Sequence, residues 1–190
     1  IVPHMQGHGL TKDIDRPYAY PQFADDLAAQ MDHLQIEIAD VFGYSLGAGV
    51  AIRLAIQHPE KVRNLISVSG TLQRDGQYSE VVAAFPDMVS NAAQIGSGVA
   101  ASPLAEMYPD IDWTTAFRKM GELESEGWDW TTEASAINAP ALLIFADADS
   151  ITGEHIIAMY RAFGGFARDA SFDGSLRPIS QLAILPGRTH

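Results

Sequence analysis

Apolar positions along the chain alternate between short continuous runs and stripes with helical spacing. The runs predict strands at 1–5, 38–42, 62–69, 140–146 and 181–185. The stripes predict helices at 20–34, 46–57 and 153–163. Strands that alternate with helices, without an internal repeat, indicate an α/β fold built on a doubly wound, mostly parallel sheet.

Residues 71–138 have a different pattern from the rest of the chain. Their helical stretches are interrupted by prolines and glycines, and they contain all three tryptophans and a cluster of acidic residues from Glu106 to Glu133. We interpret them as a cap of short helices inserted into a core made of residues 1–70 and 139–190. Both ends of the insertion follow strands, so we expect the cap to cover the carboxyl ends of the sheet, with its acidic residues facing solvent and its apolar residues lining an acyl pocket.

The sequence Gly43-Tyr44-Ser45-Leu46-Gly47 lies between a predicted strand and a predicted helix. This G-x-S-x-G pattern in that context predicts a nucleophile elbow, a sharp turn that exposes the Ser45 hydroxyl. We expect Gly43 and Gly47 to stand where a Cβ atom would clash. The Leu46 N–H, at the positive end of the following helix, is the candidate donor to a developing oxyanion.

A serine nucleophile needs a base, and the base needs an orienting carboxylate. The strand ending at Ala146 is followed by Asp147 and Asp149, and the chain closes on His190 after the last predicted strand. The order Ser, Asp, His and the shared strand-end location suit a hydrolase triad. Asp149 is the preferred acid and Asp147 the alternative.

These segments resemble the α/β-hydrolase family. The likeness is carried by Gln6-Gly7-His8-Gly9, by the Ser45 elbow, by the strand and loop from Pro140 to Asp149, and by the segment from Leu185 to His190. The resemblance implies Ser45 as nucleophile, Asp149 as acid and His190 as base, with no cofactor. Ala146 stands where the family pattern around the acid has glycine.

The same resemblance predicts that parts of the fold lie outside the chain. Relatives have strands before the segment that matches Ile1, one of which leads to the second oxyanion donor, and a helix after the catalytic histidine. We therefore expect a piece of a longer protein, in which either buried strand edges lack partners or the sheet closes in a new register. Unpaired buried backbone groups cost about 1–3 kcal/mol each.

Composition narrows the function further. The 190 residues include 12 basic and 24 acidic side chains, giving a net charge of −12, so nucleic acid and anionic membranes are unsuitable partners. The absence of cysteine excludes disulfides and thiolate metal sites, and fits a cytoplasmic protein. No histidine, aspartate or glutamate set has metal-ligand spacing, so we expect no metal. A surface position is expected for His155.

We therefore expect a serine hydrolase that cleaves a small or medium neutral ester through an acyl-enzyme on Ser45. Tyr44, Trp113 and Trp128 are the candidate substrate contacts, although aromatics in the insertion also suit a small core of its own. Carbon–carbon bond hydrolysis, lactone opening, perhydrolysis and peptidase activity use nearly the same residues. A ligand-binding or signalling protein with little turnover is the alternative from another class.

Overall fold

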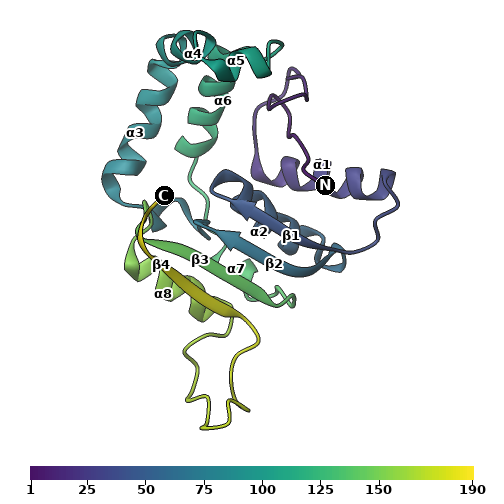
Figure 1. The fold of residues 1–190 in the computed structure, drawn as a ribbon, viewed down its shortest axis with the longest axis vertical. Helices are drawn as coiled ribbons and strands as arrows, with labels where there is room; N and C mark the ends of the chain where they lie inside the picture. The colour runs from purple at the N-terminus through teal and green to yellow at the C-terminus, as the bar shows by residue number, and fades with distance from the viewer.

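The computed structural model describes residues 1–190 and is built on a four-stranded sheet. Its strands are β1 (Ala39–Tyr44), β2 (Val62–Val68), β3 (Ala141–Ala148) and β4 (Gln181–Thr189). They lie in the order β1-β2-β3-β4, and every neighbouring pair is parallel. The predicted parallel α/β sheet is therefore confirmed (Figure 1).

The core lies between this sheet and three helices. Helix α1 (Tyr20–His33) precedes β1, α2 (Leu46–Gln57) connects β1 to β2, and α8 (Gly153–Ala162) connects β3 to β4, with short 3-10 turns at η1 (Pro59–Lys61) and η2 (Arg74–Gly76). One cluster of 24 buried residues joins all three helices to β2 and β3. On β1, the side chains of Phe42 and Tyr44 are exposed. The packing of these helices on the sheet holds the ends of the strands, and the loops that follow them, in fixed positions.

The segment between β2 and β3 is helical, as the interrupted pattern predicts. It contains α3 (Ser79–Ser90), α4 (Ala92–Ala100), α5 (Pro103–Met107), α6 (Trp113–Ser125) and α7 (Thr131–Ala134). Helices α3 and α6 rise beside each other from the carboxyl ends of the strands, and α4 and α5 lie across their far end (Figure 1). Gly121 allows this pairing, because a Cβ atom there would lie 2.8 Å from a methyl group of Val89.

A buried lysine ties this helical segment to the loop before α1. Lys119 on α6 is 7% exposed, and its ammonium lies 2.6 Å from a carboxylate oxygen of Asp13. It also donates to the carbonyl oxygens of Ile14, at 2.8 Å, and Arg16, at 2.9 Å. Since the charge is paired and its three protons have acceptors, this lysine can be buried without a large penalty.

The prediction of a strand at the start of the chain is wrong. Ile1–Met5 has no regular structure, and Ile1 and Val2 are almost fully exposed. A hollow of about 710 Å³ separates residues 2–6 from the outer edge of β1. A segment without a neighbouring strand has no partner for its backbone groups, so its apolar pattern alone does not make it a strand. Residues 1–5 do not pair with β1, so the sheet has not closed in the new register that was one of the two expectations.

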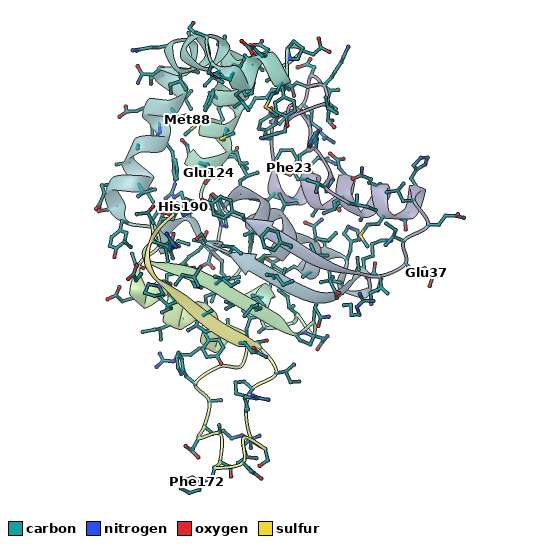
Figure 2. The ribbon with its side chains drawn as sticks, in the orientation of Figure 1. Phe23, Glu37, Met88, Glu124, Phe172 and His190 are labelled. Carbon is teal, nitrogen blue, oxygen red and sulfur yellow. The ribbon has the colours of Figure 1, made fainter.

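The connection from α8 to β4 is a long excursion away from the sheet. Residues 163–180 contain turns and bends but no helix or strand, and Phe172 near their middle is fully exposed. The excursion projects from the end of the molecule opposite the helical insertion, with Phe172 at its tip (Figure 2). Strand β4 then runs to Thr189, four residues beyond the predicted end, because it pairs with β3 as far as Ala148.

Candidate active site

Ser45 occupies the sharp turn between β1 and α2. Its backbone has φ 53° and ψ −121°, a strained conformation for a residue other than glycine. A Cβ atom on Gly43 would lie 2.2 Å from the carbonyl oxygen of Gly47, so position 43 requires glycine. The same expectation for Gly47 is wrong, because a Cβ atom there would meet nothing within 4 Å. The Leu46 N–H has no acceptor within the chain and remains available.

The structure brings Ser45, His190 and Asp149 together. The Ser45 Oγ lies 2.8 Å from Nε2 of His190, and Nδ1 of His190 lies 2.8 Å from Oδ1 of Asp149. The Asp149 side chain is fully buried, whereas that of His190 is about one third exposed. The three residues come from the carboxyl ends of β1, β3 and β4, which meet at one edge of the sheet.

The two candidate acids behave differently although they are two positions apart. Asp147 is exposed and accepts the backbone N–H groups of Gly187, at 2.9 Å, and Arg188, at 3.2 Å. These two bonds lower the pKa of Asp147. Asp147 makes no hydrogen bond to His190, so its contact is with the loop that leads to the histidine. The geometry therefore favours Asp149 as the partner of the ring.

Asp149 is held as a carboxylate by donors on three sides. Its Oδ2 accepts the hydroxyl of Ser69 at 2.6 Å and the N–H of Ala146 at 3.0 Å, and its Oδ1 accepts the N–H of Ser150 at 2.8 Å. Burial opposes ionisation, but these hydrogen bonds and His190 outweigh it, and the pKa of Asp149 is lowered. The hydroxyl of Ser150 also lies 2.9 Å from Nδ1 of His190.

A pocket of about 280 Å³ opens beside these residues. Helices of the insertion and the ends of the strands both contribute to its wall, and Figure 2 shows Met88 on α3 and Glu124 on α6 above His190. The wall is formed by Tyr20, Ser45, Leu46, Gly49, Ser69, Thr71, Gln77, Val81, Phe85, Met88, Met120, Glu124, Trp128, Ser150 and His190. It contains no lysine or arginine, so no such side chain is present to bind an anionic substrate group.

The three aromatic residues expected to contact substrate have separate locations. Trp128 lines the pocket, whereas Trp113, at the start of α6, does not. Tyr44 borders the larger hollow beside β1, although its ring lies 5.5 Å from that of His190. Trp128 also packs against Tyr20, with ring centroids 5.1 Å apart and planes tilted by 55°, so part of its area belongs to the core rather than to a substrate surface.

Several pocket residues gave no signal in the sequence. Ser69 and Ser150 look like ordinary loop serines, and Tyr20 looks like the first residue of a helix. The expectation that the acidic residues of the insertion face solvent is wrong for Glu124, which is half-buried and lines the pocket. Its partner Tyr20 is 104 positions away, a separation that local pattern analysis does not reach.

The expected surface position of His155 is also wrong. This histidine is buried, and its Nε2 accepts the N–H of Leu72 at 3.1 Å. Gly76 makes the burial possible, because a Cβ atom there would lie 2.4 Å from the imidazole ring. The structure has no group of three or more histidine, aspartate and glutamate side chains placed to hold a metal ion. None of its helices is both long and apolar enough to span a bilayer.

A family model described as alpha/beta hydrolase fold matches residues 1–95, half of the chain. This chain belongs to the α/β-hydrolase family. It is 42% identical over 67 residues to 2-hydroxymuconate semialdehyde hydrolase of Pseudomonas sp. (strain CF600), a segment that is 35% of this chain and 24% of that protein. It is 40% identical over 82 residues to pimeloyl-[acyl-carrier protein] methyl ester esterase of Neisseria meningitidis serogroup B (strain MC58), 42% of this chain and 30% of that protein.

The likeness in structure extends over nearly all of this α/β-hydrolase. MGS-M2, an alpha/beta hydrolase enzyme from a deep-sea metagenome library, superimposes with a TM-score of 0.75 at 15% identity, covering 98% of this chain and 70% of that one. At this identity the match establishes the fold alone. The segments shared with the two curated relatives span about a quarter to a third of their length, so activity and substrate are matters for proposal.

Proposed function

We propose that the chain carries the catalytic site of a serine hydrolase that cleaves a small or medium ester or a related acyl compound. One observation carries the proposal: the continuous contact from the Ser45 Oγ through both nitrogens of His190 to Asp149, with both distances at 2.8 Å. Geometry of this kind, rather than fold, indicates the chemistry.

The proposed reaction has two halves. His190 Nε2 takes the Ser45 proton as Oγ attacks the ester carbonyl, and the Leu46 N–H donates to the oxyanion. Collapse expels the alcohol, which receives the proton from His190, and leaves an acyl-enzyme. Water then attacks the acyl carbon, gives a proton to His190, and restores the Ser45 hydroxyl as the acid leaves.

The rest of the site supports these roles. The low pKa of Asp149 keeps a negative charge beside Nδ1, which favours the tautomer with its proton on Nδ1 and a free acceptor at Nε2. The pocket wall contains apolar side chains from the insertion, which suit the acyl or alcohol part of an ester. An insertion that shares its pocket with Ser45 acts as a cap in this proposal.

The test uses the full-length protein with a fluorophosphonate probe and a series of p-nitrophenyl esters of rising acyl length. Labelling of Ser45 together with ester turnover would support the proposal. Labelling without turnover of any ester, lactone or peptide amide would favour a binding or signalling role instead. Hydrolysis of a carbon–carbon bond is the second candidate, and 2-hydroxymuconate semialdehyde, the compound in one relative's name, tests it directly.

A further inference from the structure

The catalytic pocket contains a carboxyl group that the triad does not use. Glu124 on α6 is half-buried and lines the same pocket as Ser45 and His190. Its Oε1 accepts the Tyr20 hydroxyl at 2.8 Å, and this is its one side-chain hydrogen bond within the chain. Oε2 has no partner, yet it is not sealed from solvent.

No positive charge of the protein compensates Glu124. None of the ion pairs of the chain includes it, although neighbouring Glu122 is paired with Arg118. The pocket wall around it contains Phe85, Met88, Met120 and Trp128, and no lysine or arginine. Burial raises the pKa of Glu124, while the bond from Tyr20 opposes that rise. A carboxyl group in such surroundings costs free energy unless a donor meets it.

We propose that Glu124 is a specificity-determining residue that selects substrates with a hydrogen-bond-donating group, a hydroxyl or an ammonium, on the part that enters the pocket. The inference rests on the proposed function, since it concerns the substrate of the Ser45 site. The donor of the substrate binds Oε2, while Tyr20 holds Oε1 and fixes the direction of the carboxyl group. A carboxylate on the substrate at that position is repelled.

The aromatic neighbours of Glu124 fit either form of donor. Tyr20 and Trp128 both line the pocket, with ring centroids 5.1 Å apart, and the buried Trp130 supports Tyr20 from the core side. Flat aromatic walls next to a carboxyl group accommodate an ammonium through its charge, and a hydroxyl through one directional bond. A purely structural role for Glu124 would need only the oxygen that Tyr20 occupies.

The experiment compares four p-nitrophenyl esters of equal chain length that end in methyl, hydroxyl, ammonium or carboxylate. They are assayed with the full-length wild type, Glu124→Gln and the control Glu126→Gln, whose glutamate is exposed and belongs to none of the ion pairs. We expect Glu124→Gln to lower kcat/KM for the ammonium ester, relative to the methyl ester, at least about tenfold. The amide oxygen still accepts a bond, so the hydroxyl ester should lose less, and the carboxylate ester should gain. Glu126→Gln should leave every ratio within about twofold.

A larger loss for the ammonium ester than for the hydroxyl ester supports the inference. A larger loss for the hydroxyl ester contradicts it, because glutamine keeps an acceptor oxygen and removes only the charge. Identical ratios in wild type and Glu124→Gln would overturn the inference while turnover of the methyl ester still supported the proposed function. Thermal unfolding checks the fold, and Glu124→Met repeats the comparison if the glutamine variant does not fold.

Equilibrium binding separates this inference from the proposed function. The same four esters are bound to Ser45→Ala and to Ser45→Ala/Glu124→Gln, which requires no turnover. A preference for donor esters that disappears with Glu124→Gln supports the selectivity even if the wild type hydrolyses nothing. If the two variants show the same relative affinities for the four esters, the inference is contradicted.

Discussion

Two hollows of the molecule can be compared, and the larger of the two is not lined by the candidate triad. The hollow beside β1 has a volume of about 710 Å³, against about 280 Å³ for the pocket at Ser45. Neither Ser45, His190 nor Asp149 lines the larger one. Ser45 and His190 both line the smaller one and are hydrogen-bonded to each other, and His190 in turn contacts the buried Asp149. A hydrogen-bonded set of nucleophile, base and acid, and not volume, therefore marks the candidate site.

The two hollows arise for different physical reasons. The larger one follows the outer edge of β1, where the sheet ends and residues 2–6 stand apart from it. The smaller one forms where the carboxyl ends of parallel strands meet α3 and α6. Strand ends place side chains from distant parts of the chain within reach of one another, whereas an unpaired edge presents mainly one strand's own backbone.

The largest expected effect belongs to the nucleophile. Ser45→Ala should abolish ester hydrolysis and fluorophosphonate labelling without unfolding the protein, because the hydroxyl makes a contact only with His190. A residual kcat above about 1% of wild type would place the nucleophile elsewhere, since a hundredfold loss corresponds to about 2.7 kcal/mol of barrier. Circular dichroism of the variant serves as the control.

Next comes the difference between the two aspartates. Asp149→Asn should reduce kcat by about a thousandfold or more, because the amide no longer fixes the His190 tautomer. Asp147→Asn should reduce it far less, since Asp147 contacts only the backbone of Gly187 and Arg188. Steady-state kinetics of the two variants decides the matter, and a larger loss for Asp147→Asn would reverse the assignment.

Methionines in the two hollows give a matched test of specificity. Met88→Ala enlarges the pocket at Ser45, and it should shift the preferred acyl length of p-nitrophenyl esters with about a tenfold change in relative kcat/KM. Met5→Ala enlarges the larger hollow and should leave the preference within about twofold. The comparison fails if both variants change the preference equally, or if only Met5→Ala does.

The smallest effect concerns acid pH. Burial lowers the pKa of His155, although Asp129 opposes this, so the unfolded chain takes up the proton first as pH falls. The stabilisation is present above the ordinary histidine pKa of about 6.5 and is lost as pH falls below it. Protonation also removes the acceptor for the Leu72 N–H, next to the pocket residue Thr71.

Urea unfolding and hydrogen exchange at Leu72, measured from about pH 7.5 to about pH 5.5, test this expectation. His155→Gln should flatten the loss of unfolding free energy across that range, while His33→Gln, exposed at the rim of the larger hollow, should not. An unchanged slope in His155→Gln would show that other groups carry the acid sensitivity.

The local pattern of apolar and polar residues was sufficient to predict most of the helices and strands. The helix predicted at 46–57 is α2 with the same bounds, and the strand–turn–helix context placed Ser45 at the end of β1. Residue order and strand ends led to Asp149 and His190, which lie together in the structure. In these cases the signal lies within a few residues or follows from parallel strands.

The remainder depends on contacts that a local pattern does not contain. Ile1–Met5 reads as a strand, but strand formation needs a partner, and the hollow beside β1 provides none. His155 at the start of a helix reads as exposed, and its burial depends on the missing Cβ of Gly76. Glu124 reads as one of many surface acids until Tyr20 is known to face it.

The long excursion before β4 leads us to expect that the candidate active site survives a break in the backbone there. Chymotrypsin, which cuts after aromatic residues, should nick the chain at fully exposed Phe172. The severed piece would still hydrogen-bond along β3, and its loop would still be held by Asp147. His190 would thus remain beside Ser45 in a two-fragment complex. If the two fragments are separated and mixed at decreasing concentration, the specific activity should fall as they dissociate. The specific activity of the intact chain should not depend on concentration in this way.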